Sequence, residues 1–151
     1  VTPNYAEGSL NADDAQVEYD KEFNYAEVTL NTSTIPIEAH EKMFGHKVNE
    51  GKTGATFNKD DQAKYVGMGW ISVEKVDGVR KFIGNVLYKV KFSEPSEDYS
   101  TKGDSIEYKT PSITGRAIAN EDGDWKDFEA FDASEDALKW INTKFGKVEG
   151  L

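Results

Sequence analysis

Two long alternating segments, joined by Asp77-Gly78, constrain this chain more than any other feature. Side chains alternate between two sets from Tyr65 to Val73 and again from Arg80 to Phe92. An Asp-Gly pair between such segments predicts a β-hairpin, because both turn positions tolerate positive φ. The arms are long compared with a typical strand of about 5–6 residues. A ribbon of this length extends past a small core and must pair with another surface, which favours assembly over catalysis.

Length and composition predict one domain spanning residues 1–151. A domain of this size buries about 68–70% of the surface that its unfolded chain exposes, so it folds without disulfides or a structural metal. The chain has no cysteine, which excludes disulfides, thiolate metal sites and cysteine nucleophiles and fits a reducing cytoplasm. No apolar run approaches the roughly 20 residues of a membrane span, and no signal peptide is recognisable. The chain begins at Val1 within a plausible strand, so a preceding segment is expected to have been removed.

The charge balance is acidic, with 28 Asp and Glu against 18 Lys and Arg and a net charge of −10. Tight binding to nucleic acid requires a basic surface, so this balance disfavours it. Solubility alone explains such a charge, and so does a surface that must not adhere to DNA.

Most of the remaining pattern is also β. Alternation predicts further strands at Gln16–Tyr19, Tyr25–Thr32, Ser105–Tyr108, Ile113–Ala119 and Trp125–Phe131. A short helix is expected over Ile37–Phe44, with cap oxygens at Ser33-Thr34 and a stop at Gly45. Lys47–Lys59 is glycine-rich and polar, which predicts an exposed loop or a flexible hairpin.

The last element is predicted to be a helix that ends at Gly146. Asp132 and Glu135 have the spacing of a capping box. An apolar stripe follows at Ala137, Leu138, Ile141 and Phe145. Two helices are too few for alternating β and α units, so the fold class is mainly β (α+β), with antiparallel strands and helices packed on them.

Candidate catalytic and metal-binding residues are few. His40 and His46 lie six residues apart with Gly45 between them, whereas a zinc protease motif needs histidines four apart on one helical face. Surface histidines are therefore expected. Gly67 and Gly69 lie within a strand pattern, so close packing or a bulge is expected there instead of a phosphate-binding loop.

Acidic pairs at Asp13-Asp14, Asp60-Asp61 and Asp122/Asp124 could be imagined as metal ligands or hydrolase acids. The EF-hand pattern fails, because counting back from Gly123 puts Ile118 at the first ligand position. Turn chemistry explains such aspartates better, since Asp bonds to its own backbone in turns. A glycosidase pair stays open, because its carboxylates need only be near in space. The chain is expected not to be an enzyme and to use no cofactor or metal.

An ordered set of segments resembles the major tail proteins of long-tailed phages, the phi13-type tail tube subunits. The set begins with Thr2–Tyr5, Leu10–Asp14 and Val17-Glu18, and continues with Ile35-Pro36 to Phe44-Gly45. It then includes Tyr65–Gly67, Val86–Phe92, Thr101–Glu107 and Trp125–Gly146. The resemblance covers essentially the whole chain, and the set is more specific than any one motif.

This resemblance implies a structural role in the virion tail, for a protein made in the cytoplasm of the bacterial host. Such subunits form rings, typically hexameric, that stack into a tube through which DNA passes without specific binding. Partners would be further copies of the chain, the tape-measure protein and tail-end proteins, with no membrane. The implied fold is a β-sandwich or half-open barrel with a long hairpin and two short helices.

Subunit contacts are expected on the N-terminal segment, the Lys47–Lys59 loop and the hairpin edges. The candidate residues are Asn11, Gln16, Lys52, Thr53, Phe57, Tyr65, Val79 and Phe82. The family usually has an aromatic and an aliphatic residue where this chain has Asn11 and Gln16, and polar residues there would weaken subunit contacts.

Two other functions stay open. A carbohydrate- or host-surface-binding β module would use exposed aromatic residues such as Tyr99, Tyr108 and Trp125. A small hydrolase would need two carboxylates within roughly 5–10 Å in a concave pocket.

Overall fold

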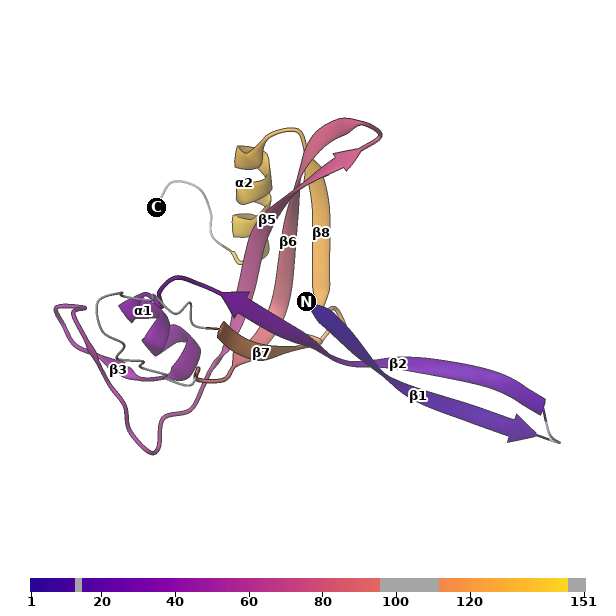
Figure 1. Ribbon diagram of the computed structural model, residues 1–151, viewed down its shortest axis with the longest axis horizontal. Helices are drawn as coiled ribbons and strands as arrows, with labels where there is room; N and C mark the ends of the chain where they lie inside the picture. Colours follow the sequence, from indigo (N-terminus) through magenta and orange to yellow (C-terminus); the bar gives the residue numbers. More distant parts are fainter. Residues whose placement is uncertain (13–14, 96–111, 147–151) are drawn as a thin grey trace, which may run out of the picture. The chain divides into compact units, whose positions relative to one another are not determined.

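The computed structural model describes residues 1–12, 15–95 and 112–146, and strands dominate them (Figure 1). In chain order the elements are β1 (Thr2–Ala12), β2 (Ala15–Asn31), α1 (Ile37–Ala39), the π-helical turn η1 (His40–Phe44), β3 (Lys47–Val48), β4 (Ala55–Thr56), β5 (Tyr65–Val76), β6 (Val79–Phe92), β7 (Ser112–Ile118), β8 (Lys126–Phe131) and α2 (Ser134–Lys144). The predicted class, mainly antiparallel β with a few helices, is confirmed. The predicted strand Ser105–Tyr108 lies outside the described residues.

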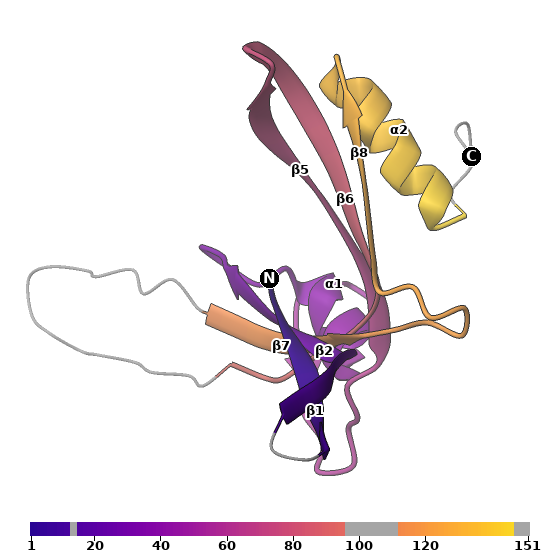
Figure 2. The same cartoon turned by 90° about the vertical axis from the view of Figure 1, so that its right-hand side faces the viewer.

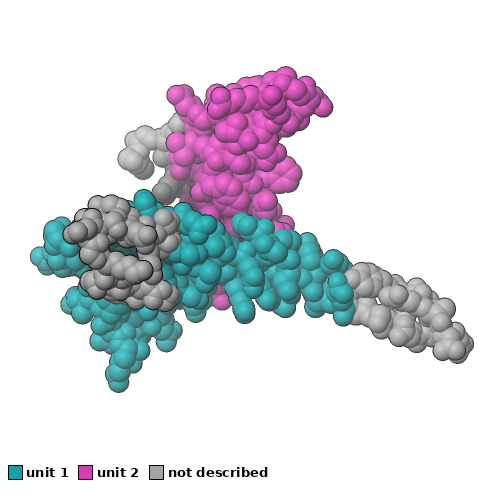
Figure 3. Space-filling view, viewed as in Figure 1, with its two compact units in different colours: residues 1–64, 91–118 teal, residues 65–90, 119–151 magenta. Residues whose placement is uncertain are grey.

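The chain divides into two compact units, coloured separately in Figure 3. The first unit contains residues 1–64 and 91–118, and the second contains residues 65–90 and 119–151. The chain passes from the second unit into the first near the end of β6, since Lys91 and Phe92 belong to the first unit. Each unit is described by itself below.

In the first unit, β2 lies between β1 and β7 (Figure 1). Pairing with β1 is antiparallel and runs from Thr2↔Glu27 to Ala12↔Ala15, with two register shifts. Pairing with β7 begins only at Ala26. The buried side chains alternate with exposed ones along residues 26–31 of β2 and along β7, as expected of strands with one buried face. They are Ala26, Val28, Ile113 and Ala117, joined by Phe44 and Phe92.

The prediction of two separate strands, Gln16–Tyr19 and Tyr25–Thr32, was wrong, because β2 is continuous across both. The intervening residues 20–24 are mostly polar and interrupted the apolar alternation. Their backbone nevertheless pairs with β1, so pairing between strands extends β2 across them. An edge-to-face contact between Tyr5 and Phe23, with ring centroids 5.9 Å apart, supports this part of the ladder.

The predicted helix over Ile37–Phe44 forms as α1 and η1, and it ends at Gly45 in the left-handed conformation with φ 81°. The predicted caps at Ser33-Thr34 do not form. The N-cap residue is Pro36, which makes no side-chain capping bond, and the Thr32 hydroxyl donates to the Thr34 carbonyl instead. The predicted Lys47–Lys59 hairpin is confirmed, with a short β3–β4 ladder.

In the second unit, β6 lies between β5 and β8. The predicted hairpin is confirmed: Asp77 and Gly78 join β5 to β6 with φ values of 51° and 80°. Positive φ at both central residues is the signature of a type I′ turn, which matches strand twist. The β8 ladder runs antiparallel from Phe82↔Phe131 to Leu87↔Lys126.

Helix α2 packs on one face of this sheet (Figure 2). A Cβ atom on Gly67 would come 2.3 Å from Phe145 Cε1, and one on Gly84 would come 3.0 Å from Trp140 Cε3. The expectation of close packing at Gly67 and Gly69 is therefore confirmed, and the packing partner is α2.

Two details of the α2 prediction were wrong. Asp132 does not cap the helix, because its carboxylate pairs with Lys81 Nζ at 2.5 Å and Ala133 takes the N-cap position without a side-chain bond. Leu138 is 52% exposed, although the stripe placed it with buried Ala137 and Ile141. Trp140 packs toward the sheet instead, with its ring 6.0 Å from that of Phe131.

Candidate functional site

The β1–β2 ribbon, defined here as β1 with residues 15–25 of β2, is one candidate interaction surface. Among the strands that the structure describes, β1 pairs with β2 alone, and this part of β2 pairs with β1 alone. A two-stranded ribbon is at best marginally stable in water by itself. The outer edge of β1 also presents backbone donors and acceptors that can pair with a further strand.

The described side chains of the ribbon are amphipathic. Tyr5 is 37% exposed, packs against Phe23 and has Lys21 Nζ 4.9 Å from its ring centroid. Asn11 and Gln16 are cross-strand neighbours near the far end of the ladder. The register therefore brings these two predicted interface positions together in space.

The second unit has two further strand edges. In the described part of this unit, β5 and β8 each pair with β6 alone. Exposed valines gather around the β5–β6 turn at Val73, Val76 and Val79, and Phe128 on β8 is 66% exposed. Long edges with exposed apolar side chains are sites of association between chains unless something covers them.

The predicted contact residues of the Lys47–Lys59 loop lie close together around β3 and β4. Lys52 has a positive φ of 52° and its Nζ lies 2.5 Å from Glu38 Oε1. This ammonium group lowers the pKa of the Glu38 carboxyl, mainly through the hydrogen bond. The backbone N–H of Thr53 donates to Asn49 Oδ1, which holds the tip of the hairpin. Phe57 is half-exposed and covers a buried histidine, described below.

The other predicted contact residues are distributed over the β5–β6 hairpin. Tyr65 begins β5, with Lys89 Nζ 4.9 Å from its ring centroid. Val79 is exposed beside the turn. Phe82 is only partly exposed, because it faces Phe131 across the ladder and the Arg80 guanidinium lies 5.2 Å from its ring.

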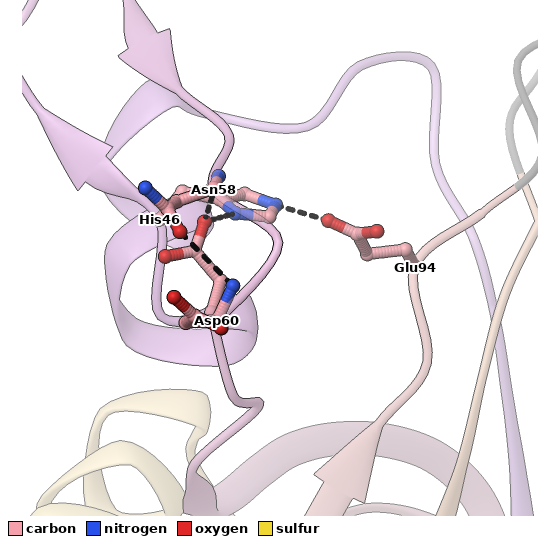
Figure 4. Close-up of polar contacts among 5 residues, drawn as sticks. His46, Asn58, Asp60 and Glu94 are labelled. Atoms are coloured by element: carbon pink, nitrogen blue, oxygen red, sulfur yellow. Dashed lines mark hydrogen bonds and ion pairs between the residues drawn. The ribbon is translucent and has the colours of Figure 1, made fainter.

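The first unit also contains a buried polar cluster, centred on His46 (Figure 4). The His46 side chain is 3% exposed. Its Nδ1 lies 2.8 Å from Asp61 Oδ2, and its Nε2 forms an ion pair with Glu94 Oε1 that lacks the alignment of a hydrogen bond. Asp61 also accepts the backbone N–H of Asn58 at 2.7 Å. Three segments distant in the sequence therefore meet at one imidazole.

Aromatic rings enclose this imidazole. The Phe57 ring lies 3.9 Å from the His46 ring, centroid to centroid, at an interplanar angle of 36°. The rings of His40 and Phe44 lie 5.6 Å and 5.7 Å away. These rings keep most water from the imidazole, which is 3% exposed.

The expectation that His40 and His46 are surface residues was wrong. His46 follows the helix-ending Gly45, which turns the chain inward, and its backbone N–H donates to the His40 carbonyl at 3.2 Å. His40 is partly buried, and its Nδ1 has no hydrogen-bond partner among the residues that the structure describes. The neighbouring sequence Phe44-Gly45-His46 and the Asp60-Asp61 pair were the only hints of this cluster, and their pairing depends on tertiary structure.

The geometry of the cluster does not suit a metal ion. Its two carboxylates lie on opposite sides of the imidazole, so they do not converge on one point. No group of three or more His, Cys, Asp or Glu suited to a metal ion occurs in residues 1–12, 15–95 and 112–146. The Asp61 pKa is lowered, first by the hydrogen bond from His46 and then by that from Asn58.

A second polar group joins β6, β8 and α2 in the second unit. The Asp127 carboxylate accepts hydrogen bonds from Lys144 Nζ at 2.5 Å and from the Tyr88 hydroxyl at 3.1 Å. The Lys144 ammonium lowers the pKa of Asp127, while burial raises the pKa of Tyr88. This group ties the end of α2 to the sheet, so we assign it a structural role.

Some of the remaining acidic and aromatic candidates lie within the described residues, and the others do not. Asp122 and Asp124 lie in a turn whose backbone N–H groups donate to Asn120 Oδ1, so the turn is organised by asparagine. Trp125 is partly buried. Asp13-Asp14, Tyr99 and Tyr108 lie outside the described residues.

The helices in the described ranges are all too short or too polar to cross a bilayer. Comparison of the chain with protein-family models, curated proteins and solved structures finds no match.

Proposed function

We propose that this chain is a structural subunit of a long-tailed phage tail tube, which assembles with copies of itself into stacked rings. The ordered set of segments that resembles phi13-type tail tube subunits suggests this role. The strand edges described above support it on physical grounds. The proposed ring is hexameric, the tape-measure and tail-end proteins are further partners, and DNA passes through the lumen.

The β1–β2 ribbon is the observation on which the proposal depends. Its two strands pair only with each other over residues 15–25 of β2, in the described part of the chain. Folding such a ribbon orders many backbone residues, each at a cost of about 1–2 kcal/mol, and none of its described side chains, in residues 2–7 and 21–25, is buried in return. A neighbouring copy that pairs with the ribbon offsets this cost, and it covers the open edge of β1 as well.

The second unit adds surfaces of the same kind. The edges of β5 and β8 and the exposed side chains of Val76, Val79 and Phe128 would be covered in a closed ring. A stable contact of this type buries on the order of 800 Å² on each partner. Curling of the sheet into a half-open barrel that neighbours complete is part of the same proposal.

The acidic composition suits a conduit for DNA. With a net charge of −10, the protein as a whole repels phosphates instead of retaining them. DNA can pass through a tube without specific binding only if it adheres weakly to the protein.

Electron microscopy and analytical ultracentrifugation of the concentrated protein test assembly directly. Rings or tubes are expected. Adjacent residues of a strand point their N–H groups alternately toward the paired strand and away from it. Proline has no backbone N–H. Of the variants Ala6→Pro and Glu7→Pro, one therefore loses a hydrogen bond to β2, and the other loses only an N–H group on the outer edge of β1.

The variant that keeps the melting temperature of the wild-type monomer should lose assembly. Assembly that is unchanged in both variants would exclude the β1 edge as a contact. A species that stays monomeric at every concentration and salt would contradict the proposed function itself.

A carbohydrate- or host-surface-binding module is the second candidate. Phe128 favours it, because an exposed ring on a sheet offers a stacking surface, and Lys126 Nζ lies 5.9 Å from that ring. Saturable binding of glycans by the monomer, lost in Phe128→Ala, would favour this function over the tube.

A further inference from the structure

The His46 cluster requires a specific protonation state. Both ring nitrogens face carboxylate oxygens, Asp61 Oδ2 on one side and Glu94 Oε1 on the other. An ionised carboxylate only accepts hydrogen bonds, and a neutral imidazole has one protonated nitrogen. The arrangement is therefore favourable at both contacts only when His46 is an imidazolium ion. A neutral ring would direct a lone pair at one of the two carboxylates.

His46 and Asp61 form the neck of a closed loop, residues 46–61. At this neck, Gly45 lies so close to Gln62 that a Cβ atom on residue 45 would come 2.4 Å from the Gln62 carbonyl oxygen. Compact loops of this length with adjoining ends are Ω-loops, and their side chains hold them together. Within this loop the β3–β4 ladder has only two residue pairs. Contacts at the neck therefore contribute much of what orders the loop.

Glu94 ties this neck to a distant part of the chain. It lies two residues after the end of β6, and it is 52% exposed, whereas the Asp61 side chain is 19% exposed. Because Glu94 reaches water easily, it is the partner that separates when the attraction is lost. When His46 is neutral and carries its proton on Nδ1, that N–H group still donates a hydrogen bond to Asp61.

We propose that His46 is a pH-dependent latch: in its protonated form it anchors the neck of loop 46–61 to Glu94, and loss of the proton releases that anchor. Phe57, which covers the ring, loses its fixed support when the anchor is released. The loop carries Lys52, Thr53 and Phe57, which the proposed function places in subunit contacts. Control of assembly by pH rests on that function, but the latch itself does not.

The groups that face His46 determine the direction of the response. The carboxylates of Asp61 and Glu94 lie at the two ring nitrogens of His46, and the ring of His40 lies 5.6 Å away. The rings of Phe44 and Phe57, which also lie against His46, are uncharged. The latch is thus closed when His46 is protonated and open when the imidazole is neutral. On the acid side, the lowered pKa of Asp61 keeps its carboxylate ionised further below neutral pH.

Hydrogen exchange of the amides in residues 46–61, corrected for intrinsic rates, tests the latch at about pH 5.5 and about pH 8, on either side of the histidine range. In the wild type we expect about tenfold less protection at the higher pH, the change that loss of one charge-assisted contact produces. Protection of the buried strand Val86–Val90 serves as the internal reference for global stability. Equal protection of the loop at both pH values would overturn the proposal.

Two variants make the test specific. In Glu94→Gln the amide can accept from a protonated Nε2 and donate to a neutral one, so protection of the loop should no longer depend on pH. In Glu94→Ala the loop should be equally open at both pH values. Glu50→Gln, which removes an exposed carboxylate from the same loop, is the matched control and should respond as the wild type does. A wild-type pH response in Glu94→Gln would assign the effect to another group.

Light scattering at the same pH values separates this proposal from the proposed function. A pH-dependent loop in a chain that never assembles would leave the latch standing and contradict the tube subunit. Assembly by a chain whose loop exchanges identically at both pH values would support the tube subunit and exclude the latch.

Discussion

Gly69 of β5 lies directly beneath Ile141 of α2, so that a Cβ atom on residue 69 would come 2.4 Å from Ile141 Cγ2. The helix reaches the sheet at this point only because the strand residue has no side chain. Gly67 and Gly84 make the same kind of space for Phe145 and Trp140. Three glycines of one hairpin therefore determine how closely α2 packs, and this packing forms the core of the second unit.

We predict that Gly69→Ala destabilises the protein by about 1–3 kcal/mol, the usual cost of overpacking a well-filled contact. The added methyl group must displace a β-branched side chain near its rigid end. Urea unfolding followed by tryptophan fluorescence measures the change. Gly54→Ala is the control, because a Cβ atom there meets nothing within 4 Å and no positive φ is involved. Equal stability of the two variants would show that α2 does not rest on Gly69.

Ile141→Ala and Leu138→Ala should differ sharply, although both residues belong to the apolar stripe read from the sequence. Ile141 is 7% exposed and Leu138 is 52% exposed. Truncation of Ile141 should cost about 2–5 kcal/mol. Truncation of Leu138 should change stability by no more than about 0.5 kcal/mol. Thermal unfolding of both variants decides the matter, and similar losses would mean that both side chains are buried.

Asp127→Asn should lower stability at neutral pH and remove part of the acid sensitivity. The pKa of Asp127 is lowered in the folded protein by Lys144 first, with a smaller contribution from Tyr88. Its contribution is therefore fully present above the ordinary value of 3.8 and is lost as the pH falls through the lower folded value. Because Asp127 is 37% exposed, we expect only about 0.5–1 kcal/mol at neutral pH.

The difference between this variant and the wild type should shrink as urea unfolding is repeated toward about pH 2, below the ordinary aspartate range. Glu129→Gln, at an exposed position of the same strand, is the charge-matched control. A constant difference across this range would show that the carboxylate of Asp127 does not carry the effect.

Gly78→Ala should destabilise the β5–β6 hairpin by about 1 kcal/mol, because an L side chain is disfavoured at the left-handed φ of 80°. No steric clash contributes, since the space around residue 78 is open. Chemical denaturation gives the value, and hydrogen exchange of β5 and β6 locates it. A neutral outcome would indicate that the turn adopts another geometry in solution.

The β5–β6 hairpin could be predicted because its information is local. Asp77-Gly78 and the alternation on either side determine turn type and pairing over a few residues. The short helix before Gly45, the Lys47–Lys59 hairpin and the helix before Gly146 are specified in the same local way. The prediction that Asp132 caps α2 was wrong because the competing interaction is not local. Lys81, fifty-one residues earlier in the chain, pairs with the Asp132 carboxylate.

The candidate surfaces were predictable only in part. Val79 and Tyr65 are exposed on the β5–β6 hairpin, as a contact surface requires, whereas Phe82 is half-buried by Phe131 and Arg80. The β1–β2 ribbon was hidden because polar residues interrupt its alternation, and pairing between strands does not need apolar side chains. His46 was misplaced at the surface, since isolated histidines in polar segments usually lie there.

By itself, the sequence determined the periodicities, the turns and the glycines at which the helices end, because these depend on neighbours within a few residues. Only the tertiary structure decided which side of α2 is covered, which carboxylates face His46 and how far β1 extends along β2. Those relationships join residues as distant as His46 and Glu94, and their energies arise from burial and proximity in space, which composition and spacing do not encode.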